Sequence, residues 1–300
     1  MRKLWIALLL FCQPLLAIAQ PKVVVTLKPI HSLVASIMEG VDTPSLLLPD
    51  GSSPHHFQLK PSTLKEIQTA DLIIWVGPTL ENFMEKPLTQ VKPKLGILSV
   101  LDTPNLKKWP LREDRDWAHS EHQHDHDHSD NTDPHIWLSL SNAKLIAQAI
   151  ADYLSKADVK HAKIYQGNAK KLHNKLDDTQ QQMHTLLDPI KNKPYLVYHD
   201  GYQYLEKEFN LNGAGTIVIN PSVPLSGKGL YTIRELIKQK QIVCVFRETE
   251  FSDNFVKKTL GELNVKIDEL DPLGTRFAPG VGNYEKTMLQ IGKTMRDCLG

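Results

Sequence analysis

Three histidines and one aspartate have the residue types and chain positions to hold a divalent metal ion. His55 and His135 lie in turn-rich segments, and His199 and Asp271 each follow a run typical of a strand. In open α/β sheets, ligands bind beyond the carboxyl ends of strands, where His199 and Asp271 are expected. Three neutral imidazoles with one carboxylate suit zinc above all, although such donors exclude neither manganese nor iron. Their spacings match no local metal motif, and any one histidine could instead be a hydrogen-bonded structural residue.

A second set of histidines lies in one biased segment, residues 113–132, which shows no apolar periodicity. Its five histidines, placed among carboxylates, are His119, His122, His124, His126 and His128. Such a composition cannot pack a core and is itself typical of metal binding. We expect a disordered, solvated loop that captures several ions weakly and passes them inward by proximity. Its presence favours a metal role for the other histidines.

The composition is that of a foldable globular chain rather than a disordered or polytopic membrane protein. Of 300 residues, 41% are hydrophobic and 23% are charged, which allows one large domain or two ordinary ones. The 35 basic residues nearly balance the 34 acidic ones, giving a formal net charge of +1. A nucleic-acid-binding protein would normally show a clear basic excess, so no nucleic-acid partner is expected.

Residues 1–19 are predicted to be a secretory signal peptide. Arg2 and Lys3 precede a short apolar run, and Ala17–Ala19 supplies a small-residue cleavage signal. The run is short for a membrane span. A lipoprotein signal using Cys12 is the alternative, but a bulky phenylalanine precedes that cysteine. We therefore expect an exported protein.

Cleavage after Ala19 would leave two cysteines, Cys244 and Cys298. An exported chain with one pair of cysteines most simply forms one disulfide. The alternative is two free thiols, with Cys244 buried in the strand-like run 242–246.

The remaining pattern predicts an α/β fold with two lobes. Short runs that are apolar on both faces alternate with helical stretches, as in parallel strands covered by helices. The runs are Val23–Val25, Asp71–Val76, Tyr195–Tyr198, Thr216–Ile219 and Ile242–Phe246. We place the N-terminal lobe at 20–157 and the C-terminal lobe at 188–300.

A single long helix is predicted to join the lobes over residues 158–187. Apolar residues recur there at alternating steps of three and four on an otherwise charged segment. Such a helix would be about 45 Å long and could act as a rigid strut. A coiled-coil dimer seam is the alternative, but the stripe is short and only moderately apolar.

Seven segments, in order along the mature chain, carry a resemblance to a known family. They are 28–35 (KPIHSLVA), 47–56 (LLPDGSSPHH), 71–78 (DLIIWVGP), 135–139 (HIWLS), 198–202 (YHDGY), 244–246 (CVF) and 270–275 (LDPLGT). The chain resembles the periplasmic zinc-binding receptors of ABC importers, the ZnuA type of metal receptor. The resemblance implies two α/β lobes with mainly parallel sheets, bridged by one long helix, with a metal site in the cleft between them.

Carried over from the family, His55 and His135 would be ligands from the first lobe and His199 a ligand from the second. Asp271 matches the position that supplies a carboxylate in manganese and iron receptors, whereas zinc members often leave that place to water or a nearby residue. Some zinc members have a glutamate where this chain has Pro54, so Asp271 or water remains as the fourth ligand.

Two more histidines are expected near the cleft. His56 follows His55 directly, and ligation of one ion by both would be strained. His31 begins the first helix, where it could support the ligands from a second layer or simply cap and pack the helix start.

The resemblance implies a monomeric periplasmic protein, without catalytic activity, that captures Zn²⁺ and delivers it to a membrane ABC permease. A manganese or iron receptor with the same four ligands is one alternative. A secreted zinc hydrolase is another, with Glu248 or Glu250 as general base beside a zinc-bound water. Because imidazoles must be neutral to bind metal, affinity is expected to fall as the pH drops through about 6.5.

Overall fold

The computed structural model describes residues 20–112, 114–116, 131–218, 226–249, 260, 263 and 265–300. The predicted signal peptide, the five histidines of the biased segment and Glu250 lie outside these described residues. Among the residues that are described, no helix is both long enough and apolar enough to cross a membrane.

The first lobe is built on a parallel sheet with strand order β2-β1-β3-β4. The strands are β1 (Val23–Val25), β2 (Ser45–Leu46), β3 (Leu72–Trp75) and β4 (Gly96–Ser99). The inner strands β1 and β3 are buried along their whole length, which their continuous apolar sequences permit. The helices are α1 (Lys28–Met38), α2 (Pro61–Thr69), α3 (Asn82–Thr89) and α4 (Leu140–Ala157).

The second lobe repeats this plan with a parallel sheet of order β6-β5-β7-β8. Its strands are β5 (Tyr195–His199), β6 (Gly213–Val218), β7 (Cys244–Glu248) and β8 (Lys266–Leu270). Its helices are α6 (Gln203–Phe209), α7 (Gly227–Gln239) and α9 (Asn283–Leu299). The predicted two-lobed α/β fold with parallel sheets is thus confirmed.

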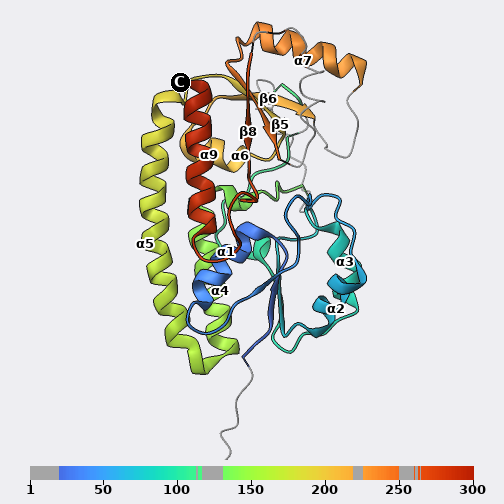
Figure 1. Ribbon diagram of the computed structural model, residues 1–300, viewed down its shortest axis with the longest axis vertical. Helices are drawn as coiled ribbons and strands as arrows, with labels where there is room; N and C mark the ends of the chain where they lie inside the picture. The colour runs from blue at the N-terminus through green and yellow to red at the C-terminus, as the bar shows by residue number, and fades with distance from the viewer. Residues whose placement is uncertain are drawn as a thin grey trace, which may run out of the picture.

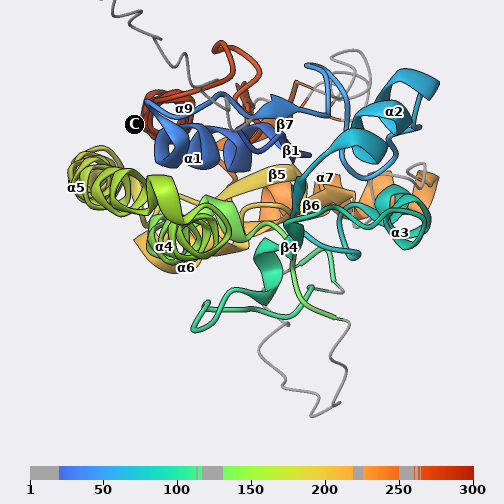
Figure 2. The ribbon, with the colours of Figure 1, turned by 90° about the horizontal axis from the view of Figure 1, so that it is seen from below.

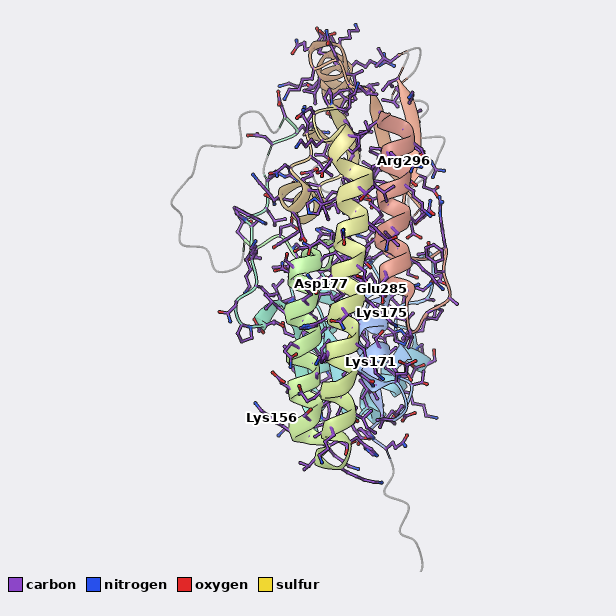
Figure 3. The ribbon with its side chains drawn as sticks, turned by 90° about the vertical axis from the view of Figure 1, so that its left-hand side faces the viewer. Lys156, Lys171, Lys175, Asp177, Glu285 and Arg296 are labelled. Atoms are coloured by element: carbon purple, nitrogen blue, oxygen red, sulfur yellow. A yellow bond between two sulfur atoms is a disulfide. The ribbon has the colours of Figure 1, made fainter. Side chains whose placement is uncertain are left out.

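One long helix joins the lobes, as predicted. A 3-10 turn at Val159–His161 leads into α5 (Ala162–Leu187), and a second turn at Asp188–Ile190 follows it. Figure 1 shows α5 running along one side of the molecule past both lobes, and Figure 3 shows it flanked by α4 and α9. Residues of the predicted apolar stripe, including Tyr165, Leu172 and Met183, are buried by other elements of the same chain. Packing against α4, α1 and α9 accounts for the stripe without a second copy of the chain.

The last helix, α9, also packs against the first lobe. It lies beside α1 (Figure 2), and the Ser32 hydroxyl donates to the Gly280 carbonyl at 2.8 Å while accepting from the Tyr284 amide at 2.9 Å. At its far end, Cys298 forms a disulfide with Cys244 of β7. The predicted disulfide is confirmed, and the alternative of two free thiols is wrong.

Candidate metal centre

Three of the four predicted ligands meet at the junction of the lobes. One ligand atom from each of His55, His135 and His199 lies within 4.8 Å of the others. The Nε2 atoms of His135 and His199 are 3.3 Å apart. Zinc–nitrogen bonds of about 2.0–2.1 Å at a tetrahedral angle would separate two nitrogens by about 3.3–3.4 Å. The spacing of these two imidazoles therefore fits a shared zinc ion.

Each histidine is positioned by a different part of the fold. His199 is the last residue of β5, a central strand, and His135 directly precedes the 3-10 turn Ile136–Leu138 that leads into α4. His55 lies in the turn-rich segment between β2 and α2. The three histidines thus come from both lobes, and they meet at the carboxyl end of β5, where such α/β folds bind ligands.

Two buried carboxylates fix the orientation of the imidazoles. Nδ1 of His135 is hydrogen-bonded to Asp133 at 2.7 Å, and Nδ1 of His199 is hydrogen-bonded to Glu248 at 2.6 Å. An ionised carboxylate can only accept, so each contact places the ring proton on Nδ1 and leaves the Nε2 lone pair for a metal when the carboxyl group is ionised. Carboxylate–histidine pairs of this kind are the usual support of metal-binding imidazoles.

The sequence analysis did not identify this role for either carboxylate. The signal for Asp133 is local, because its side chain also accepts from the backbone amide of His135, two residues later. The signal for Glu248 is not local. Strands β5 and β7 pair with Val197 opposite Phe246, and two residues further along that register His199 lies beside Glu248. Oε1 of Glu248 is hydrogen-bonded to Nδ1 of His199, on the other side of the ring from Nε2, a position that suits orienting the ring.

Burial shifts the pKa of His55 and of the two carboxyl groups in different directions. Burial, together with the neighbouring imidazoles of His199, His135 and His56, lowers the pKa of His55 well below 6.5. Burial opposes ionisation of Asp133, but the charge and hydrogen bonds of His135 outweigh it and lower its pKa. Burial raises the pKa of Glu248 to about 8. A cation bound to His199 would favour the carboxylate form of Glu248.

The histidines line a small cavity with largely apolar walls. The other lining residues are Ser53, Pro54, Trp137, Glu248, Pro272 and Leu273. The Trp137 ring packs 5.3 Å from that of His135, and its indole nitrogen donates to the Pro272 carbonyl at 3.0 Å, which joins the two lobes beside the site. Water is poorly held against such walls, so electrostatic attraction to a cation is weakly screened there.

Asp271 lies outside the three-histidine group among the residues that the structure describes. Its Oδ2 accepts from the Thr275 hydroxyl and the Arg276 amide, both at 3.0 Å. Its Oδ1 is buried and has no hydrogen-bond partner in the described part of the chain.

The two additional histidines also lie outside that group. Nε2 of His31 is 2.9 Å from the Pro44 carbonyl, so this ring ties the start of α1 to the loop before β2. The His56 ring is 6.1 Å from that of His55, measured between ring centroids.

The two ends of the biased segment lie beside the site. Its two ends are joined by hydrogen bonds from the Leu111 amide to Asn131 at 2.9 Å and from the Asp133 amide to Trp109 at 2.8 Å. An antiparallel bridge joins Pro110 and Thr132. We call residues 109–112 and 131–133 the stem. Because Asp133 is the last residue of the stem, the stem ends only two residues before His135.

Comparison with known proteins gives consistent matches over nearly the whole chain. Residues 23–298 match the family described as ZnuA, zinc-uptake complex component A, periplasmic. The high-affinity zinc uptake system protein ZnuA of Brucella abortus is 33% identical over 316 residues, covering 96% of this chain and 95% of that protein. The protein of the same description from Yersinia pestis is 33% identical, covering 94% and 92%.

Solved structures share the fold. A crystal structure of ZnuA superposes with a TM-score of 0.79 at 19% identity, covering 94% of this chain and 100% of that one. The solute-binding protein FpvC from Pseudomonas aeruginosa, in complex with Mn²⁺, gives a TM-score of 0.77 at 22% identity, covering 94% and 98%.

Proposed function

The chain belongs to the ZnuA family of periplasmic zinc-uptake components, and we propose that His55, His135 and His199 hold the Zn²⁺ ion that it carries. The observation that carries this assignment is the 3.3 Å separation of two Nε2 atoms whose rings each donate from Nδ1 to a buried carboxylate. With both rings protonated at Nδ1, the two Nε2 lone pairs are close enough to bind one cation.

Two carboxyl groups of the protein can balance the charge of the ion. Asp133 and Glu248 stand directly behind two of the ligands and supply two negative charges when ionised, matching the two positive charges of zinc. Zinc capture then requires no proton release from His55, because its lowered pKa keeps it neutral near pH 7. Members of this family serve transport and do not catalyse a reaction, which leaves the hydrolase alternative without support.

The fourth coordination position belongs to Asp271 or to water. Oδ1 of Asp271 is the candidate atom, because Oδ2 is already engaged by Thr275 and Arg276. Three imidazoles with at most one carboxylate favour zinc over manganese or iron, whose receptors would prefer more oxygen donors. Zinc affinity of an Asp271→Asn variant distinguishes the two candidates, since a directly bound carboxylate would be missed and a water would not.

The transport context is carried over from the family as part of this proposal. We infer export by the signal peptide 1–19, action as a monomer in the periplasm, and delivery of zinc to a membrane ABC permease. The histidines of the segment 113–132 (His119, His122, His124, His126 and His128) would collect zinc next to the stem, close to His135. His31 and His56 would support the site without binding the ion.

The experiment is metal analysis with competition titration on a mature variant that lacks residues 117–130. This deletion leaves the stem intact, whereas removing 113–132 would also cut the bridge between Pro110 and Thr132. We expect one tightly held zinc that manganese does not displace and that is lost in His55→Ala and His199→Ala. A deletion variant without tight zinc would mean that the segment is the zinc binder, and would overturn the assignment.

A further inference from the structure

Arg112, in the stem, makes a buried charge cluster with two residues of the second lobe. Its side chain is 11% exposed, and the carboxylates of Asp200 and Glu206 are 8% and 6% exposed. Nε of Arg112 donates to Asp200 at 2.9 Å, Nη2 donates to the other oxygen of the same carboxylate, and Nη1 donates to Glu206 at 2.8 Å. The fork of the guanidinium therefore fixes the direction of both partners as well as their distance.

These partners adjoin the metal ligands along the chain. Asp200 directly follows His199, and Glu206 lies on α6, the helix that begins four residues after His199. Arg112 itself lies on one leg of the stem, and the other leg ends at Asp133, the carboxylate that orients His135. The cluster thus connects the two chain segments that deliver His135 and His199.

Helix α6 contacts the second leg of the stem as well. The Gln203 amide donates to Oδ2 of Asp133 at 3.1 Å and to the Pro110 carbonyl at 2.9 Å. The Tyr204 hydroxyl donates to the Asp133 carbonyl at 2.8 Å and accepts from the Trp109 amide at 3.2 Å. The stem and α6 therefore form one hydrogen-bonded unit. One proposed zinc ligand, His135, follows the stem, and another, His199, precedes α6.

We propose that Arg112 is a positioning residue for zinc binding: it fixes the separation of His135 and His199 without touching the ion. This inference rests on the proposed function of the three-histidine site. A metal site must be held within about 0.5 Å of its productive geometry. His135 and His199 come from different lobes, so their separation depends on contacts between the lobes. The charge cluster supplies charged contacts of this kind next to the segments that carry both histidines.

The expected effect is a loss of zinc affinity that exceeds any effect on folding. Arg112→Gln should weaken zinc binding about 10-fold, the lower end of the range for residues that hydrogen-bond metal ligands directly, mainly through faster dissociation. Arg112→Lys should recover only part of this loss, because an ammonium group cannot make the same forked contact with a carboxylate.

The test uses the full-length mature protein and three readouts: zinc affinity by chelator competition, the zinc dissociation rate, and the absorption spectrum of the Co²⁺-loaded protein. Urea unfolding of the metal-free variants reports any structural effect separately. Arg296→Gln is the matched control, because Arg296 lies on the exposed side of α9 and pairs with its neighbour Asp297 (Figure 3). The double variant Arg112→Gln/Asp200→Asn removes one positive and one negative charge from the cluster. It allows the proposal to be tested if the single variant is poorly folded.

Support would be a changed cobalt spectrum and faster zinc dissociation in Arg112→Gln, with non-additive effects of Arg112→Gln and Asp200→Asn on affinity. The proposal is overturned if zinc affinity, dissociation and the cobalt spectrum stay at wild-type values in a folded Arg112 variant, whatever its unfolding curve. Loss of zinc in His199→Ala alongside such a result would reject the positioning role only. Tight zinc retained by His199→Ala would instead reject the proposed function.

Discussion

Gly201 lies directly against the ring of His199: a Cβ atom at this position would be 2.9 Å from Nε2 and 3.0 Å from Cε1. It would also be 3.4 Å from Cδ2 of His135. A side chain here would therefore press on the nitrogen proposed to bind zinc. The close approach of the two imidazole rings therefore favours glycine at position 201, where the backbone itself does not require it.

Gly201→Ala should weaken zinc binding by at least about tenfold while leaving the metal-free fold intact. The added methyl group would displace the imidazole ring of His199 from its position in the site. Chelator competition measures the affinity. Gly167→Ala is the control, since a Cβ atom at that position in α5 meets nothing within 4 Å. Equal affinities of the two variants would contradict the arrangement described.

Glu248→Gln should lower zinc affinity about 10- to 100-fold. The amide loses the negative charge and can donate to Nδ1 of His199, which would move the ring proton to Nε2 and block the metal lone pair. Isothermal titration with zinc measures the change. Glu39→Gln, on the exposed surface after α1, should bind as the wild type does, and a Glu248→Gln variant that matched it would argue against the orienting role.

Zinc binding should persist below the pH at which an ordinary histidine protonates. The pKa of His55 lies well below 6.5, so protons compete for this ligand only at more acidic pH than the sequence analysis predicted. In the metal-free protein, the same depressed pKa contributes stability above pH 6.5 that is lost as the pH falls toward the folded-state pKa. Zinc affinity followed from pH 8 to pH 4.5 checks the first point, and a midpoint at 6.5 or higher would refute it.

Glu81→Gln should flatten the pH dependence of stability. Glu81 is fully buried at the start of α3, its Oε2 accepts from the Val76 amide at 2.6 Å, and burial raises its pKa to about 7. The folded state then binds more protons than the unfolded state between pH 4.5 and 7, so this group's contribution decreases as the pH rises.

Glutamine resembles the protonated acid, so the Glu81→Gln variant should match the wild type near pH 4.5 and exceed it by about 3 kcal/mol at pH 8. Urea unfolding of both metal-free proteins at the two pH values gives the comparison. A constant difference between the proteins at both values would show that Glu81 is ionised throughout.

Replacing both Cys244 and Cys298 with alanine should lower the free energy of unfolding by about 2–4 kcal/mol. The bond closes a sequence separation of 54 residues and fastens α9 to β7, both of which are buried at the cysteines. Urea unfolding with and without reductant measures the effect. The alanine variant should be indifferent to reductant, and an unfolding curve equal to that of the oxidised wild type would contradict the prediction.

The sequence predicted the central strands of both sheets from their apolar runs. Strands β3, β5 and β7 stand in the middle of their sheets and have continuous apolar runs. Of the edge strands, β6 and β8 overlap the predicted run at 216–219 and the strand-like run before Asp271. The edge strands β2 and β4 were not predicted, because they are short and half-exposed and carry no such run. Pattern methods detect the environment of a residue, and a short, half-exposed strand resembles a loop.

The same limit applies at the metal centre. The three histidines were found through residue type, flanking strands and the resemblance, but the partner of His199 depends on the pairing of β5 with β7. Arg112 was not singled out, since nothing in its local sequence links it to Asp200, 88 residues away. Contacts between distant segments decide how ligands are held, and one sequence does not display them.

The packing of α9 against α1 makes the first lobe depend on the last helix of the chain. The first lobe buries α1 beneath a helix formed by the last residues of the sequence, through contacts that span about 250 positions, such as Ser32 with Tyr284. Contacts of such long sequence separation form slowly. The packing around α1 is therefore completed only when the last helix of the chain is present.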